Sequence, residues 1–422
     1  MRKGLFLCLI YLPILINAQT NGFSDDLLAL REVLQKTPSY KAQIKGESKK
    51  EYEALFESLL LNPQADKKGQ QYFLQLARLL FPIRDNHLGF YQLPDYSRFK
   101  NRDSIAAFVA SPEFEKYPSA PIDIDSLENI LKSKPDSSIE GIYHYGRHYS
   151  VGVYKSDERE YAGVVISSEI NLWKKGQIAV WLYETEPKIY KAIYAHPLTK
   201  SFIYQPIEKY RNEQLVNSVF YGSYISSPYS KYPDRVDHVN LHSNVPLFEL
   251  KNISPDVQYL LVRTFQANKK TSDQSRAFYD SVKNVLTAKT LILDLRNNQG
   301  GSAREAAKYL KLIKQFAKKG KVYILQNNGT ISEAEIFILS LKGKPNIFFA
   351  GQTTKGMLSY GSNYGKTVLL PGKVHQVYIT DMKGSSGLLK YEDVGIDAEI
   401  PLDNGSDWIE QILRLLEQYQ PT

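Results

Sequence analysis

From residue 257 onward, short apolar runs alternate with longer stretches in which apolar residues recur at helical spacing. The runs are rich in Leu, Ile and Val, which is typical of buried strands. Strand and helix signals that follow one another in this way predict a partly parallel sheet with helices packed against it. The expected strands are Val257–Phe265, Thr290–Leu295, Val322–Leu325 and Ile347–Ala350, and the expected helices lie near Ser272–Leu286 and begin at Ser302 and at Ser332.

The first part of the chain has a helical pattern throughout. Leucines recur every three or four residues behind Ser24, which is a candidate helix N-cap. We therefore expect residues 19–105 to form an N-terminal helical cap. Its three expected helices begin near Ser24, Ser48 and Asp66.

Between residues 106 and 245 the pattern changes to strands rich in β-branched and aromatic residues. Many of the 30 tyrosines lie here, and tyrosine as a half-buried strand former explains them better than a dedicated ligand surface. We expect this region to form a β-rich domain, a sandwich or a barrel. The clearest strands are Tyr149–Lys155, Tyr161–Ile166 and Gln177–Tyr183. Residues 246–422 would then form the α/β core, with a mixed sheet and helices.

The N-terminus has the pattern of a secretory signal peptide, expected over residues 1–18. Two basic residues precede an apolar run over residues 5–16, and Ala18 offers a small residue for cleavage. The run is too short to span a bilayer comfortably, so stable membrane insertion is not expected. Cys8 is the only cysteine, and the mature chain would therefore have no disulfide and no thiol chemistry. We expect an exported protein, either periplasmic or secreted.

Composition and charge narrow the candidate functions. With 43% hydrophobic and 23% charged residues, the chain has the composition of a globular protein. Its net charge is +8, but the lysines are scattered in pairs and form no basic run with interleaved aromatics, so nucleic acid is not an expected partner. The sequence has neither the clustered ligand spacing of a zinc site nor a Gly-x-x-x-x-Gly-Lys phosphate motif, so no metal or organic cofactor is expected.

Two of the expected strands end in turns whose residues are candidates for catalysis. Gly300-Gly301 follows the strand that ends at Leu295, and glycines there let the backbone approach a ligand beside a helix N-terminus that favours negative charge. Ser332 lies where the next strand gives way to a helix, so its hydroxyl can face a cleft beside free backbone N–H groups, as acyl transfer requires. The plain alternatives are a tight turn without a ligand and a simple helix N-cap.

These turns carry a resemblance to the tail-specific, or C-terminal processing, serine peptidases, a family that includes the tricorn core. Asp294-Leu-Arg-Asn-Asn-Gln-Gly-Gly301 resembles one signature of that family, and Gly329-Thr-Ile-Ser-Glu-Ala-Glu-Ile336 is similar, position by position, to the string that holds the nucleophile. The resemblance implies that Ser332 is the nucleophile. It also implies an oxyanion hole, which would be formed by Gly300, Gly301 and Glu333.

A serine nucleophile needs a base, and here the chain departs from the classical branch of the family. Met357 occupies the position of the lysine that this branch uses. Lys355 lies two residues earlier, about 6–7 Å away along an extended segment. A Ser–Lys dyad that uses Lys355 is therefore one alternative.

The tricorn-like branch, which the chain resembles more closely, uses an upstream histidine and a C-terminal glutamate. His87, in Asp85-Asn-His-Leu-Gly89, resembles the upstream element. Glu392 falls on the position of the acid that orients the histidine, with Asp393 as the neighbouring alternative. A structural histidine in a turn and an exposed surface acid are the plain alternatives.

The resemblance thus implies an exported serine peptidase that cleaves polypeptides through an acyl-enzyme, with a triad of Ser332, His87 and Glu392. We expect His87 Nε2 within about 3–4 Å of Ser332 Oγ, in a cleft between the cap and the core. Glu392 should reach the other ring nitrogen, and Met357 should line the pocket. Two other functions stay open. One is a catalytically inactive protein that binds a hydrophobic ligand or a peptide on the same scaffold, and the other is hydrolysis of a non-peptide ester or amide.

Overall fold

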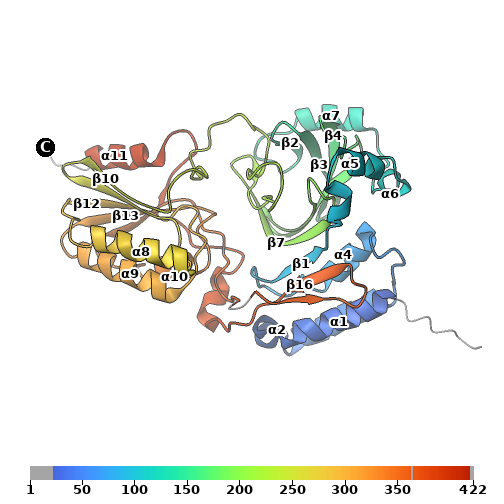
Figure 1. Ribbon diagram of the computed structural model, residues 1–422, viewed down its shortest axis with the longest axis horizontal. Coiled ribbons are helices and arrows are strands. Elements are labelled where there is room, and N and C mark those ends of the chain that lie inside the picture. Colours follow the sequence, from blue (N-terminus) through green and yellow to red (C-terminus); the bar gives the residue numbers. More distant parts are fainter. Residues whose placement is uncertain (1–21, 363–364, 419–422) are drawn as a thin grey trace, which may run out of the picture.

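The computed structural model describes residues 22–362 and 365–418, which form two lobes (Figure 1). The predicted signal peptide, residues 1–18, lies outside the described residues. Across the described ranges, no helix is both long and apolar enough to cross a membrane. The structure combines an α/β sheet, a barrel-like antiparallel sheet and a group of N-terminal helices, so the predicted fold class is confirmed.

The N-terminal helices form where apolar residues recur at helical spacing. They are α1 (Gly22–Lys36), α2 (Pro38–Gln43), α3 (Glu47–Leu60) and α4 (Gln70–Arg78). One face of α1 is fully buried through Phe23, Leu27 and Leu30. Thr37 caps α2, and Pro38 lies in its first turn, where a missing N–H has no consequence. These helices share one hydrophobic core with the barrel.

The middle of the chain forms a closed antiparallel barrel. Its strands are β2 (Gly141–Tyr145), β3 (Tyr149–Asp157), β4 (Glu160–Ser168), β5 (Ile178–Glu186), β6 (Ile189–Ala195), β7 (Phe202–Arg211), β8 (Gln214–Leu215) and β9 (Tyr229–Ser230). They pair in the order β7-β6-β5-β4-β3-β2-β9-β8, and β8 pairs back with β7. Tyr145, Tyr149 and Tyr229 are buried in mutual ring contact. Tyrosines therefore fill the core of the barrel, as expected for an eight-stranded barrel packed with side chains.

Short helical segments precede the barrel strands. They are η1 (Tyr96–Phe99), α5 (Arg102–Val109), α6 (Pro112–Glu115) and α7 (Ile124–Lys132). Leu127 and Leu131 of α7 pack against Val164 and Ile166 of β4 in a small separate cluster. The helix thereby covers part of the outer face of the barrel.

Three further strands extend the barrel sheet beyond β7. They are β1 (Gly89–Gln92), β15 (Thr367–Leu369) and β16 (His375–Tyr378). β1 pairs with β7 on one side and with β16 on the other, and β15 forms the edge. One sheet thus contains β1 from before residue 105, the barrel strands, and β15 and β16 from after residue 245. The division of the chain into four parts at residues 18, 105 and 245 stays a prediction. These strands were not predicted, because they are short and their partners lie far along the chain.

The C-terminal part forms the predicted mixed sheet. Its strands, in spatial order, are β10 (Phe248–Ser254), β11 (Val257–Val262), β12 (Thr290–Asp294), β13 (Lys321–Gln326), β14 (Ile347–Gly351) and β17 (Ile400–Pro401). β11, β12, β13, β14 and β17 are parallel, and β10 pairs antiparallel with β11. β12 is buried along its whole length, as parallel strands covered on both faces are.

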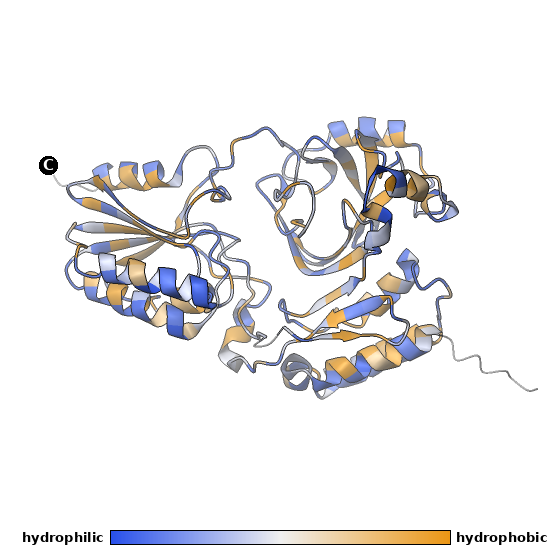
Figure 2. Cartoon of the chain, viewed as in Figure 1, coloured by the Kyte–Doolittle hydropathy of each residue, from blue (hydrophilic) through white to orange (hydrophobic). Residues whose placement is uncertain are grey.

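Helices cover both faces of this sheet. They are α8 (Lys269–Val282), α9 (Ala303–Phe316), α10 (Glu333–Leu339) and α11 (Trp408–Gln418), and a 3-10 turn, η2 (Ser386–Tyr391), lies before β17. α8, α9 and α10 pack on one face and α11 on the other (Figure 1). Figure 2 shows hydrophilic residues on the outward surface of these helices. The carboxyl ends of β12, β13 and β14 lie at one edge, which is where parallel sheets usually place functional loops.

Candidate active site

Ser332 lies in the turn between β13 and α10, in a strained backbone conformation. Its φ is 59° and its ψ is −123°. Such angles cost a non-glycine residue about 1–3 kcal/mol and persist only when the surroundings hold them. The Ser332 N–H donates to Met357 O at 3.0 Å and to Glu335 Oε2 at 3.0 Å. A strained strand-to-helix turn of this kind exposes a nucleophilic hydroxyl.

Glu335 is the anchor of this turn. Its fully buried carboxylate also accepts hydrogen bonds from Gly356 N at 2.8 Å, Met357 N at 3.0 Å and Thr354 Oγ1 at 2.6 Å. Burial raises the pKa of Glu335, and these donors act in the opposite direction. No role was predicted for Glu335, although it belongs to the Gly329–Ile336 motif around Ser332.

Gly300 meets the nucleophile turn at close range, whereas Gly301 lies against the backbone of Phe265. A Cβ atom on Gly300 would lie 2.7 Å from Glu333 N and 2.9 Å from Ser332 Cβ, and the φ of Gly300 is +76°. The Gly300 N–H itself donates to Asn298 Oδ1 at 2.9 Å. Within the described part of the chain, the N–H groups of Gly301 and Glu333 have no acceptor. Gly300 therefore supplies the close approach, whereas Gly301 and Glu333 have free donors for an oxyanion.

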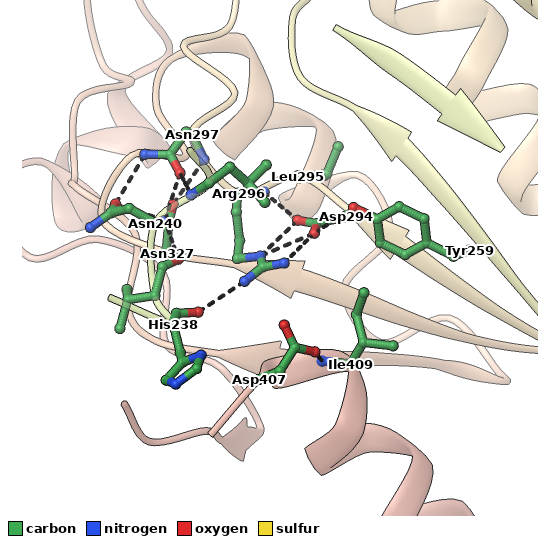
Figure 3. Close-up of polar contacts among 12 residues, drawn as sticks. His238, Asn240, Tyr259, Asp294, Leu295, Arg296, Asn297, Asn327, Asp407 and Ile409 are labelled. Atoms are coloured by element: carbon green, nitrogen blue, oxygen red, sulfur yellow. Dashed lines mark hydrogen bonds and ion pairs between the residues drawn. The ribbon is translucent and has the colours of Figure 1, made fainter. Parts of the chain in front are cut away.

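A buried ion pair holds the strand end that precedes these glycines (Figure 3). Arg296 Nη2 donates to Asp294 Oδ2 at 2.7 Å, and Tyr259 OH donates to the same oxygen at 3.0 Å. Arg296 also donates to His238 O at 3.0 Å and lies over the ring of Trp408, with Cζ 5.3 Å from the centroid. The strand end is thus attached to a loop from the barrel side and to α11.

Three asparagines join the loops after β12 and β13 (Figure 3). Asn327 Oδ1 accepts from Asn297 N at 3.0 Å and from Gly329 N at 3.0 Å. Asn240 Oδ1 accepts from Asn297 Nδ2 at 3.0 Å and from Asn327 Nδ2 at 3.2 Å. The two loops that carry the glycines and the serine are therefore bonded to each other.

His87 approaches Ser332 from the turn between α4 and β1. The distance from His87 Nε2 to Ser332 Oγ is 3.2 Å, within the predicted range, and the two residues are 245 positions apart in the chain. Burial, together with the charge of Lys355, lowers the pKa of His87 to about 4. The imidazole is therefore neutral near pH 7 and can accept a proton from the hydroxyl. The pair lies where the N-terminal part of the chain meets the α/β core.

Glu392 lies beside His87 but does not contact its ring. Its Oε1 accepts from Asn86 N at 2.7 Å, and its Oε2 accepts from Leu358 N at 3.1 Å and Ser359 N at 2.8 Å. The predicted contact with the second ring nitrogen is absent because both oxygens face backbone donors. His87 Nδ1 is buried and has no partner among the described residues. Glu392 is fully buried, and burial raises its pKa to about 7, so it is not an exposed surface acid.

Asp393 holds the His87 turn from the neighbouring position. It accepts hydrogen bonds from Arg84 Nε at 2.9 Å and from Asn86 Nδ2 at 2.9 Å. Asn86 Nδ2 also donates to Gly356 O at 2.6 Å. The role of Asn86 was not predicted, and its place directly before His87 is the only signal for it in the sequence.

Lys355 and Met357 lie in the segment bound by Glu335. Burial lowers the pKa of Lys355, while the charges of Glu208, Glu335 and Glu392 act in the opposite direction. Within the described residues, no hydrogen bond joins Lys355 Nζ to Ser332. Met357 contributes its carbonyl to the Ser332 N–H, and its side chain is partly exposed. Nor does any group of three or more His, Cys, Asp or Glu side chains in the described ranges form a site for a metal ion.

The arrangement of serine, neutral histidine and free backbone N–H groups defines a candidate serine hydrolase site. Residues 256–317, which include β11, β12 and the glycine turn, match the family model of peptidase family S41. This match supports a peptidase of the serine type, for which a polypeptide is the implied substrate. No curated protein matches the chain by sequence.

Several solved structures are similar to the chain. A putative peptidase from Parabacteroides merdae is 12% identical, with 93% of this chain and 96% of that chain covered and a TM-score of 0.39. The photosystem II D1 C-terminal processing protease is 13% identical, with 93% and 97% covered and a TM-score of 0.37. The tricorn protease is 12% identical, with 94% and 37% covered and a TM-score of 0.43.

Proposed function

We propose that this protein is an exported serine peptidase that cleaves polypeptides through an acyl-enzyme. The observation that carries the proposal is the 3.2 Å distance between His87 Nε2 and Ser332 Oγ at a strained strand-to-helix turn. The match of residues 256–317 to peptidase family S41 points to the same class. Export rests on the signal peptide pattern of residues 1–18. Use of a histidine would place the chain in the tricorn-like branch of the family.

In the first step, Ser332 Oγ attacks the carbonyl carbon of the scissile peptide bond, and its proton passes to His87 Nε2. The C=O electron pair moves to the oxygen. The N–H groups of Gly301 and Glu333 are free to bind that oxyanion. Both donors are backbone groups in turns held by hydrogen bonds, so little reorganisation is needed during the reaction.

In the second step, the tetrahedral intermediate collapses and the C–N bond breaks. The His87 imidazolium gives its proton to the leaving amine, and Ser332 stays acylated. Water then attacks the ester, with His87 as general base, and releases the new carboxyl end. Glu392 contributes by position, since it binds the backbone N–H of the residue before His87. No metal or organic cofactor takes part.

Replacement of the nucleophile tests the proposal. Ser332→Ala should reduce hydrolysis of an unfolded protein substrate by about 10⁴-fold or more. The free energy of unfolding should fall by no more than about 1 kcal/mol, because alanine and serine have the same backbone strain and only the hydrogen bond between Ser332 Oγ and His87 Nε2 is lost. Ser340→Ala, in the turn that ends α10, is the matched control and should keep wild-type turnover.

Three outcomes would contradict part of the proposal. Unchanged turnover in Ser332→Ala would exclude this nucleophile. A folded wild-type protein that neither cleaves peptides nor reacts with a fluorophosphonate probe would favour the inactive ligand-binding protein. Hydrolysis of small esters without any peptide cleavage would favour a non-peptide substrate.

A further inference from the structure

Lys209, on β7 of the barrel, reaches out of the barrel toward the α/β core. Its Nζ donates to Lys355 O at 2.8 Å, Val394 O at 3.0 Å and Thr354 O at 3.4 Å. The side chain is 4% exposed. Within the described residues, no carboxylate lies at ion-pair distance from its ammonium group. A buried lysine therefore has backbone carbonyls as its partners, and these come from two separate loops.

Both loops belong to the candidate site. The loop over residues 352–359 binds Glu335 and accepts the Ser332 N–H through Met357 O. The loop over residues 391–396 carries Glu392, which binds the backbone beside His87. The Lys209 ammonium group thus binds both the loop that contacts Ser332 and the loop that contacts the backbone beside His87.

A second cation on the same strand supports this arrangement. Arg211 Nη1 donates to Thr353 O at 2.9 Å. Residues 209 and 211 point to the same side of a strand, because side chains alternate along it. β7 thus presents two cations to one row of carbonyls.

We propose that Lys209 is a positioning residue of the active site, whose ammonium group holds the two loops in the arrangement that aligns His87 with Ser332. The inference rests on the proposed peptidase function. It gives the barrel a part in the reaction, although the barrel supplies no group that touches the reacting atoms.

The chemistry of the amino group makes this role dependent on pH. An ammonium group has three N–H donors for the three carbonyls, whereas a neutral amine has two donors and a lone pair. Burial lowers the pKa of Lys209 to about 7. Among the charges that face it, Arg211 and Lys355 act in the same direction, and Glu335 and Asp393 act against it. Above about pH 7 the loops therefore lose one of their bonds, and turnover should decline.

Two substitutions at Lys209 test the inference. Lys209→Met should lower kcat by about 10- to 100-fold with a smaller change in KM, because misalignment of reacting groups by about 1 Å has effects of that size. Lys209→Arg keeps charge and donors and does not titrate, so it should retain more activity and move the alkaline decline to higher pH. If Lys209→Met does not fold, the pH profile of turnover in Lys209→Arg is the test. An alkaline decline at the same pH as in the wild type would overturn the inference.

The matched control is Lys200, which is equally buried in the barrel at 4% exposure. Its Nζ donates to Leu172 O at 3.0 Å and to Gln177 Oε1 at 2.9 Å, away from both loops. Lys200→Met should lower the free energy of unfolding without a change in the pH profile. A profile that moves equally in Lys200→Met and Lys209→Met would show a general effect of barrel stability and overturn the inference.

Hydrogen exchange separates this inference from the proposed function. Exchange of the amides of residues 354–359 should be faster in Lys209→Met than in the wild type, whether or not the protein is a peptidase. Faster exchange in a chain whose wild type cleaves no peptide would overturn the proposed function alone. Unchanged exchange and unchanged kcat in a folded Lys209→Met protein would overturn the role of Lys209.

Discussion

Two buried acids of the α/β core and two buried bases of the barrel find their partners in different places. In the core, Asp294 and Glu335 are fully buried acids whose oxygens accept several hydrogen bonds from nearby donors. In the barrel, Lys191 and Lys209 are buried bases that face groups outside the barrel; Lys191 Nζ lies 3.9 Å from Asp393 Oδ1. The polar partners of these two lysines lie in the loops over residues 352–359 and 391–396, outside the barrel. These contacts join the barrel to the two loops of the candidate site.

The two regions also differ in how their strands place functional groups. The parallel strands of the core end at one edge. Because β12 and β13 are neighbours in the sheet, the turns that follow them lie side by side. Antiparallel barrel strands share no such edge, and their inward positions are filled by aromatic rings. The core thus supplies Ser332 and the free backbone N–H groups, the N-terminal part supplies His87, and the barrel supplies contacts to the loops around them.

After loss of the nucleophile itself, the largest effect should come from the close contact between Gly300 and the nucleophile turn. Gly300→Ala places a Cβ at 2.7 Å from Glu333 N and at 2.8 Å from Ile331 O, at a φ of +76°. Turnover should fall by more than about 100-fold, because the oxyanion donors are displaced. The free energy of unfolding should fall by about 1–3 kcal/mol. Steady-state kinetics and chemical denaturation measure the two effects.

Gly343→Ala is the matched control for that variant. Gly343 has a φ of +74°, but a Cβ there would meet no atom within 4 Å. The variant should lose about 1–2 kcal/mol from the backbone conformation alone and keep its turnover. Equal losses of turnover in the two variants would show that the contact with Glu333 N does not cause the loss in Gly300→Ala.

A smaller effect is expected from the charge beside the histidine. Burial comes first and Lys355 second in lowering the pKa of His87 to about 4. His87 must be neutral to act as base, so the acid limb of kcat/KM should lie near pH 4 in the wild type. Lys355→Met should raise the pKa of His87 and move this limb to higher pH, with activity near pH 7 retained. Complete loss of activity at every pH would instead support a Ser332–Lys355 dyad.

The smallest effect should come from the interior of the barrel. Tyr149→Phe removes the hydrogen bond between Tyr149 OH and Tyr229 OH, which is 2.6 Å long. The free energy of unfolding should fall by about 1 kcal/mol, and kcat should stay at the wild-type value. A clear loss of kcat in this variant would show that the barrel interior, and not only its outward-facing lysines, controls the site.

Much of the fold could be predicted because it follows from short-range patterns. Four core strands, β11, β12, β13 and β14, were predicted within a few residues of their bounds, whereas β10 and β17 were not predicted. The barrel tyrosines are structural, as expected. The predicted distance between His87 and Ser332 also agrees with the structure. Glu392 was predicted on the histidine ring, whereas it binds Asn86 N, Leu358 N and Ser359 N.

The sequence by itself determined the four central strands of the core, its helices α8, α9 and α10 and the turns that carry glycine and serine, because hydrophobic periodicity and turn chemistry act over a few residues. Only the tertiary structure decided which distant groups meet. The pairing of β1 with β16, the carbonyls around Lys209 and the donors around Glu392 join residues that are far apart in the chain. Such contacts depend on how whole elements pack, and a buried carboxylate or ammonium group binds whichever donors or acceptors that packing brings to it.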